Sequence, residues 1–62
     1  MFEKIFPDGK KVVINDGIIA LYHADGSRLT ISNTDYYFSE HGYNCQTDED
    51  AANKYHELFA GY

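Results

Sequence analysis

The chain has little of several things that small proteins use for stability or chemistry. It has one cysteine, Cys45, so a disulfide within the chain is excluded, and it has one proline and no tryptophan. A single cysteine is typical of a reducing compartment. No segment approaches the roughly 20 apolar residues of a membrane span, and residues 1–6 lack the apolar run of a signal peptide. We therefore expect a soluble cytoplasmic protein.

The length allows one domain, residues 1–62, with a thin core. A chain of this size buries only about 60% of its unfolded surface. Disulfides cannot supplement that core, so its packing has to be good. The six tyrosines and four phenylalanines are the obvious material for it, because each aromatic side chain can bury on the order of 150–250 Å².

Positive charge is scarce in the second half of the chain. Residues 1–28 hold four acids and four bases, whereas residues 29–62 hold six acids and one base, so the whole net charge of −5 lies after Arg28. A negative field repels phosphate groups, which argues against direct nucleic-acid binding and against anionic membranes. It favours either a basic protein partner or no more than solubility.

Three Asp-Gly pairs mark turns in the first half: Asp8-Gly9, Asp16-Gly17 and Asp25-Gly26. Asp-Gly between short β-prone runs is the strongest local signal for a hairpin. The pairs predict an antiparallel meander with strands near residues 2–6, 10–14, 18–24 and 27–32. The run Tyr36-Tyr37-Phe38-Ser39 predicts a fifth strand over 36–39.

The faces of this sheet depend on the loop lengths. Three-residue loops in the first two hairpins place one apolar set together: Phe2, Phe6, Val12, Ile14, Ile18, Ala20 and Tyr22. They give the second face a mixed set: Glu3, Ile5, Lys11, Val13, Ile19, Leu21 and His23. The third hairpin stays open, because a two-residue loop sends Leu29 and Ile31 to the first face and a three-residue loop sends them to the second.

A helix is predicted over residues 48–60. Thr47 is a good N-cap, acidic residues follow it where the helix dipole favours negative charge, and Gly61 is placed to end the helix. Apolar residues then recur as one stripe: Ala51, Tyr55, Leu58, Phe59 and Tyr62. The expected fold class is therefore α+β, an antiparallel four- to five-stranded β-meander with one C-terminal amphipathic helix packed on one face.

No motif for catalysis, phosphate binding or calcium binding is present. His41, Cys45 and His56 invite a metal or nucleophile interpretation, but a closed zinc site needs four ligands. A chain of this size also has little room for a substrate cleft. We expect no enzyme activity, no cofactor and no metal site, with Cys45 as a small buried residue.

The candidate partner-binding residues lie after the meander. The acids of the Asp-Gly pairs have a role in turns, and Asp48, Glu49 and Asp50 have a role at the helix start. These roles leave one feature unexplained, the lack of basic residues after Arg28 to balance the acids. Tyrosines among carboxylates are typical of an interface, although alternation within an edge strand, one ring inward and one outward, is the simpler explanation of residues 36–39. The set predicted to bind a partner is Asp35, Tyr36, Tyr37, Glu40, Tyr43, Asp48, Glu49 and Glu57.

The acidic stretch from Asp35 to Glu57 and the aromatic cluster Tyr36-Tyr37-Phe38 give the chain a general resemblance to a class of small proteins. It resembles the acidic phage-encoded inhibitors of host defence, including anti-CRISPR and nucleic-acid-mimicking proteins. The resemblance implies a stoichiometric inhibitor without a cofactor. Such a protein occupies a basic, nucleic-acid-binding site on a nucleoprotein complex in the host cytoplasm.

The alternative is a structural or interaction module with no inhibitory role. A single helix covers only one face of the sheet, so the second face, with Ile5, Val13, Ile19 and Leu21, would be left bare. A homodimer formed through that face would cover it.

Overall fold

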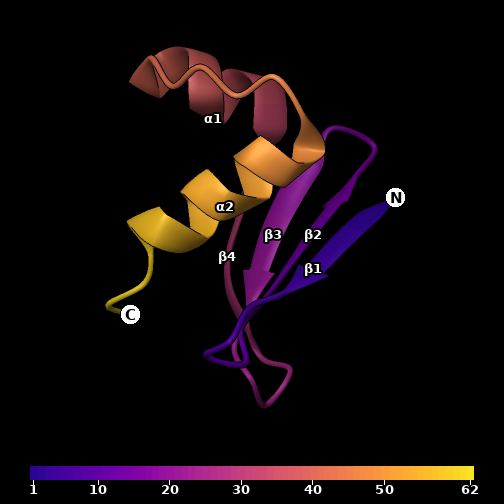
Figure 1. The fold of residues 1–62 in the computed structure, drawn as a ribbon. Helices are drawn as coiled ribbons and strands as arrows, with labels where there is room; N and C mark the ends of the chain where they lie inside the picture. The colour runs from indigo at the N-terminus through magenta and orange to yellow at the C-terminus, as the bar shows by residue number, and fades with distance from the viewer.

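Three tight turns join four strands into one antiparallel sheet. The computed structural model describes residues 1–62, and its strands are β1 (Phe2–Ile5), β2 (Lys11–Asn15), β3 (Ile18–Tyr22) and β4 (Arg28–Asn33), in the order β1-β2-β3-β4 (Figure 1). Each strand pairs with its neighbour in the chain. The predicted α+β class and the first four strands of the meander are confirmed.

The first turn has the predicted three-residue loop. The Phe6 N–H donates to the Lys10 carbonyl at 2.8 Å, and the Gly9 N–H donates to the Phe6 carbonyl at 2.9 Å. Gly9 has a φ of 91°, a backbone conformation that costs other residues energy. The result is that Phe2, Phe6, Val12 and Ile14 share the core side, as expected.

The second turn is one residue shorter than predicted. Asn15 pairs directly with Ile18, and both central residues have positive φ, 51° at Asp16 and 77° at Gly17. These are the dihedrals of a type I′ turn, whose twist matches that of the strands it joins. A shift of one residue reverses the faces of a strand. The predicted faces of β3 are therefore wrong: Ile19 and Leu21 are buried in the core.

The third turn has a three-residue loop, closed by the His23 N–H on the Ser27 carbonyl at 2.8 Å. A β-bulge follows, because Leu21 pairs with Thr30 while Tyr22 pairs with Arg28. The extra residue, Leu29, packs against the core, whereas Ile31 lies opposite Ala20 and is 47% exposed. The two alternatives for this hairpin each placed Leu29 and Ile31 on the same face. The structure places them on opposite faces, since a bulge changes the alternation along its strand.

The predicted fifth strand is instead a helix, α1 (Thr34–His41). Asn33 caps it by accepting the Tyr36 N–H on Oδ1 at 3.0 Å, and Gly42 ends it with a φ of 73°. Phe38 is buried in the core. The strand prediction over 36–39 is therefore wrong, because two caps and this packing outweigh the β-propensity of the aromatic run.

The predicted C-terminal helix is present as α2 (Asp48–Leu58). Thr47 Oγ1 accepts the Asp50 N–H at 3.1 Å, as its role of N-cap requires. The helix ends two residues before the predicted boundary, with Phe59 as the C-cap. The chain thus has two helices rather than one.

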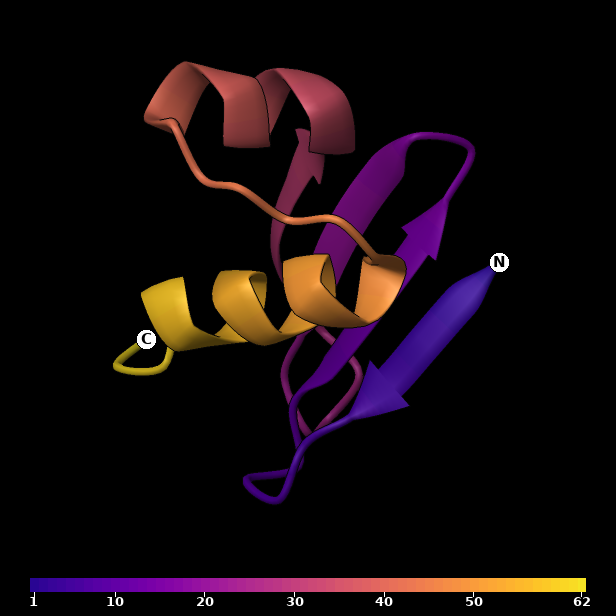
Figure 2. The same cartoon turned by 45° about the horizontal axis from the view of Figure 1, so that its top comes forward.

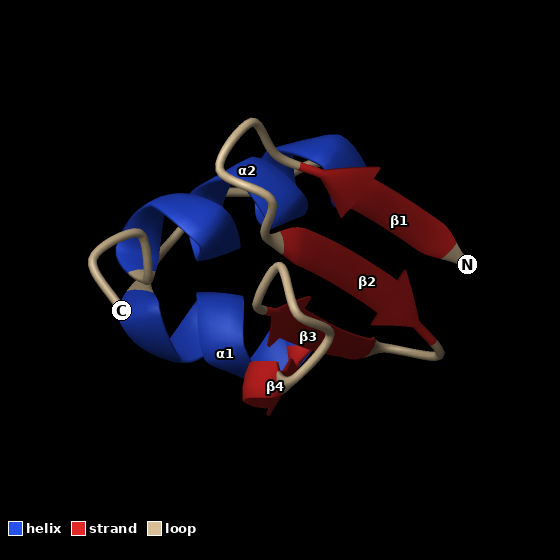
Figure 3. Ribbon diagram, turned by 90° about the horizontal axis from the view of Figure 1, so that it is seen from below, coloured by secondary structure: helices blue, strands red, loops and turns tan.

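Both helices contribute to one core on one side of the sheet, and α2 lies across the strands (Figures 2 and 3). Tyr55 of α2 is fully buried at its centre. Its hydroxyl shares hydrogen bonds with Ser32 Oγ at 2.9 Å and Thr30 Oγ1 at 3.2 Å, so α2 is attached to β4 as well as packed on β2. The core consists of Phe6, Val12, Ile14, Ile19, Leu21, Phe38, Ala51, Ala52 and Tyr55.

Candidate functional site

The predicted partner-binding residues all lie on the two helices and on the connector between them. Asp35, Tyr36 and Glu40 are exposed on α1, and Tyr36 is 69% exposed. The fold positions them because Phe38, on the same helix, is buried in the core and Asn33 caps the helix start. Asp35, Tyr36 and Glu40 thus stand on a short, anchored helix.

The other two tyrosines of the set turn inward. The Tyr37 ring meets the edge of Tyr55 with centroids 5.3 Å apart, and the Tyr43 ring lies 6.3 Å from Phe38. Burial raises the pKa of the Tyr37 hydroxyl, and the neighbouring Tyr55 and Tyr43 add to that effect. These two rings extend the core, which leaves Tyr36 as the aromatic side chain of the set that is free to contact a partner.

The side of the molecule formed by α1, α2 and their connector is called the helical side. Its acidic residues differ in whether a cation balances them. Glu49 Oε2 lies 2.7 Å from Lys4 Nζ, and Glu57 Oε1 lies 4.0 Å from Lys54 Nζ. No lysine, arginine or histidine nitrogen lies within 4.0 Å of the remaining four carboxylates. Those four are Asp35, Glu40, Asp48 and Asp50, and all are exposed. We call this set the unpaired acids.

The connector over residues 43–47 separates two hollows that acids border. Asp35 and Asp48 line a hollow of about 300 Å³, together with Thr34. Asp50 and Glu57 line the other, of about 540 Å³. Because the connector borders both, three of the four unpaired acids lie beside one strip of chain that joins α1 to α2.

Cys45 lies in that connector, lines both hollows and is half-buried rather than buried as expected. Burial and the negative charge of Asp50 raise the pKa of its thiol, which keeps it protonated and weakly nucleophilic. His41 stacks on Tyr43 with ring centroids 5.7 Å apart, and His56 bonds to Asp8. The three side chains thus have separate neighbours, and no group of three or more His, Cys, Asp or Glu residues is arranged to hold a metal ion.

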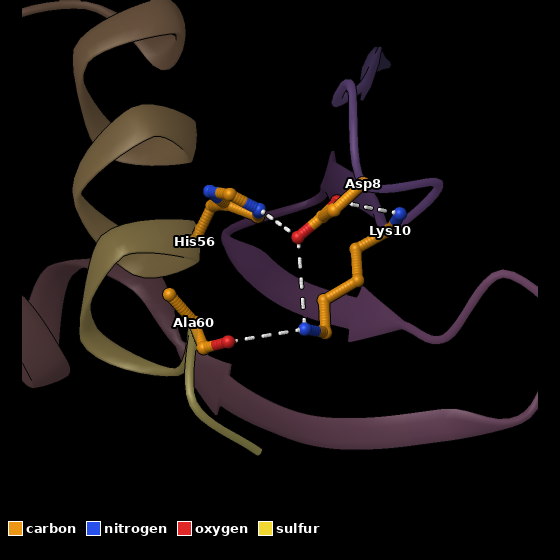
Figure 4. A network of polar contacts seen from close by, with 4 residues as sticks. All are labelled: Asp8, Lys10, His56 and Ala60. Atoms are coloured by element: carbon orange, nitrogen blue, oxygen red, sulfur yellow. Dashed lines mark hydrogen bonds and ion pairs between the residues drawn. The ribbon is translucent and has the colours of Figure 1, made fainter.

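A polar network that the sequence did not suggest joins the first turn to the end of α2 (Figure 4). Asp8 Oδ1 accepts the Lys10 N–H at 2.9 Å, and Asp8 Oδ2 accepts from His56 Nε2 at 2.8 Å. Lys10 Nζ lies 3.6 Å from Asp8 Oδ2 and donates to the Ala60 carbonyl at 3.4 Å. The Lys10 N–H, then His56, lower the pKa of Asp8. The local Asp8–Lys10 bond follows from turn chemistry, but the partner 48 residues away does not.

The second face of the sheet carries no helix, and its composition differs from the one predicted. Ile5 and Val13 lie on it, but Ile19 and Leu21 are fully buried beneath the helices. The shorter second turn and the bulge direct other residues of β3 and β4 onto this face in their place. We call this side the bare sheet face; its apolar residues are Ile5, Val13, Ile18, Ala20, Tyr22 and Ile31, and the register places Glu3 and Lys11 on it as well.

Comparison of the chain with protein-family models, with curated proteins and with solved structures returns no match. Neither helix has the length and apolar composition that crossing a membrane requires.

Proposed function

We propose that this chain is a small acidic binding protein that occupies a basic, nucleic-acid-binding surface of a host protein complex in the cytoplasm and inhibits it stoichiometrically. The observation that carries the proposal is the set of unpaired acids on the helical side. The bases nearest to them already have partners: Lys4 Nζ lies 2.7 Å from Glu49 Oε2, and the Lys54 ammonium group lies 4.7 Å from the Tyr43 ring centroid and 4.0 Å from Glu57.

The unpaired acids match what a phosphate-binding surface recognises. Such a surface presents lysine and arginine side chains to phosphate groups, and carboxylates can take the place of those phosphates. A complementary field raises the association rate and favours the correct partner more than it raises affinity. Tyr36, exposed between Asp35 and Glu40 in sequence, supplies an aromatic anchor within the charged set.

Rigidity of the helical side also supports the proposal. Asn33 and Gly42 cap α1, and Thr47 caps α2. Binding then immobilises few additional side chains or loops, and this keeps the entropic cost of association low. An acidic surface that serves only solubility needs no such fixed arrangement.

The proposal is tested by competition. A panel of purified RNA-guided nuclease complexes, each holding a fluorescent DNA duplex, is titrated with the protein at about 50 mM and about 300 mM salt. We expect one complex to release its duplex at a one-to-one ratio at low salt, and to require more protein at high salt because counterions screen the carboxylates. Retention of the duplex by every complex at low salt would contradict the proposal.

Two double variants with the same net charge separate position from total charge. Asp35→Asn/Glu40→Gln removes two unpaired acids from α1, and Ala24→Lys/Ser27→Lys adds two cations at the β3–β4 turn. Each raises the net charge from −5 to −3. The first should weaken competition and the second should leave it nearly unchanged. Equal weakening by both would show that total charge, not the helical side, decides binding.

A further inference from the structure

We propose that the bare sheet face binds a second copy of this chain, giving a twofold dimer whose two helical sides point away from each other. This inference does not depend on the proposed function, because the dimer is formed by the opposite side of the molecule. Three observations support it: the shape of the face, its charge balance, and the contrast with the helical side.

The face is apolar across three adjacent strands. Val13, Ala20 and Ile31 lie side by side in register on β2, β3 and β4. Ile18 and Tyr22 flank Ala20 along β3. Ile18, at the start of β3, is 38% exposed and Ile31, on the edge strand β4, is 47% exposed, so branched aliphatic side chains stand in water on this face, where a packed sheet partner would remove them from water.

The centre of the face is a shallow hollow of about 360 Å³. Ala20, only 5% exposed, forms its floor because its side chain is short. Larger side chains, those of Val13, Ile18, Tyr22 and Ile31, surround it, and Asn15 and Asp16 close it at the β2–β3 turn. In a twofold pair the same patch meets itself, so a projecting isoleucine of one copy can enter the hollow of the other.

Charges on this face cancel, which suits contact between identical surfaces. Glu3 Oε2 lies 3.7 Å from Lys11 Nζ, so the ions beside β1 balance within one copy. Asp16 lies at the β2–β3 turn, and Arg28 pairs with Tyr22 near the opposite end of β3. If the strands of the two copies run antiparallel, each Asp16 meets an Arg28 of the other copy, which fixes the orientation of the pair.

The helical side cannot provide such a contact, because residues 29–62 carry the entire net charge of −5 and two such surfaces repel. A standard interface takes about 800 Å² from each partner, which is about a fifth of the chain's accessible surface of 3981 Å². A stable pair of these chains therefore needs contact over most of one face of the molecule rather than at a single turn or helix end.

The test is the mass of the native chain in solution. Sedimentation velocity between about 5 μM and about 500 μM should show a shift from 7.1 kDa toward twice that mass, in the affinity range of a small interface. The variant Ile18→Lys/Ile31→Lys should remain monomeric throughout, because its lysines are solvated in the monomer and buried in the dimer. The control Tyr36→Lys, on α1, should dimerise like the native chain.

A second measurement covers the case in which the lysine variant loses its fold. In an equal mixture of isotope-labelled and unlabelled native chains, intermolecular contacts should join the Ile31 and Ala20 methyl groups. Arg28→Glu should weaken the dimer about threefold to tenfold, and Asp16→Asn in the same chain should restore part of the loss. A native chain that stays monomeric at about 500 μM, or a dimer that persists in the folded lysine variant, would overturn the proposal.

Discussion

His56 Nε2 donates to Asp8 Oδ2 at 2.8 Å, and the His56 imidazole lies flat on the Phe6 ring with centroids 3.9 Å apart. Two residues 48 positions apart thus join the β1–β2 turn to the last turn of α2. The contact has a polar part and an apolar part. Solution conditions can change the first without removing the second.

The polar part predicts a dependence of stability on pH. The pKa of Asp8 is lowered from an ordinary value of 3.8 by the Lys10 N–H and by His56. A carboxyl whose pKa is lower in the folded chain adds stability above its unfolded pKa, and that stability is lost as pH falls through the folded pKa. Asp8→Asn should therefore lower the melting temperature at about pH 6, and the effect should shrink as the pH falls below 3.8 and the Asp8 carboxylate becomes protonated.

A second background, His56→Gln, separates the contribution of the Lys10 N–H from that of His56. The side-chain amide oxygen introduced by Asp8→Asn can still accept the Lys10 N–H, so the variant reports mainly the lost charge. In a His56→Gln chain the effect of Asp8→Asn at about pH 6 should be smaller, because its long-range partner is gone. Thermal unfolding followed by circular dichroism measures both. An effect of Asp8→Asn that is the same at every pH would contradict the linkage.

The Tyr55 hydroxyl predicts a cost for a small deletion in the core. Tyr55→Phe keeps the ring but removes the partner that Ser32 and Thr30 share. Leaving these part-buried hydroxyls without it should lower the free energy of unfolding by about 1–2 kcal/mol. Tyr36→Phe, at an exposed position, should change it by less than about 0.5 kcal/mol. Urea unfolding of the two variants makes the comparison, and equal stabilities would show that the shared hydroxyl bonds add nothing.

Gly9 and Gly26 form a matched pair for testing a contact between two turns. Their φ angles are 91° and 92°, so alanine meets similar backbone strain at both. A Cβ on Gly9 would come within 2.8 Å of the Ala24 Cβ, whereas a Cβ on Gly26 would meet no atom within 4 Å. Gly9→Ala should therefore be the more destabilising, by about 1 kcal/mol or more.

A compensating change should confirm that the extra cost is steric. Gly9→Ala/Ala24→Gly removes the atom that is struck, so the double variant should recover the difference between the two alanine variants apart from the cost of a new glycine. Free energies from urea unfolding decide this. A Gly26→Ala chain that is as unstable as Gly9→Ala would mean that the turns do not constrain each other.

Cys45 should react slowly with iodoacetamide. Its thiol pKa is raised by burial and by Asp50, and alkylation proceeds through the thiolate. At about pH 8 the native chain should be modified more slowly than the same chain in about 6 M urea, as followed by mass spectrometry. Asp50→Asn should increase the native rate, and a native rate equal to the unfolded rate would contradict the protection of the thiol.

Local chemistry made part of the fold predictable. Pro7-Asp8-Gly9 specifies one turn type, and Thr47 followed by acids specifies one helix start, so the first hairpin and α2 were predicted nearly in full. Asp16-Gly17 suits both a two-residue and a three-residue loop. The strand that follows is apolar on both sides, so its pattern cannot select the face, and only packing under α2 does.

α1 shows how competing local signals are decided by the tertiary fold. Asn33 and Gly42 are a helix cap and a helix stop at suitable spacing, while Tyr36-Tyr37-Phe38 is β-prone. Phe38 settles the competition by entering the core formed with α2. For the candidate site, the charge imbalance was readable from composition, but the pairing of Glu49 with Lys4, 45 residues away, depends on the complete fold.

The strand order β1-β2-β3-β4 also bears on how the chain folds. All four strands are consecutive in the chain, so the sheet can pair before either helix docks on it. In such an intermediate Val12, Ile19 and Leu21 on one face, and Ile18 and Ile31 on the other, are all open to solvent. Any folding intermediate in which Tyr55 has not yet docked therefore exposes an apolar sheet on both sides.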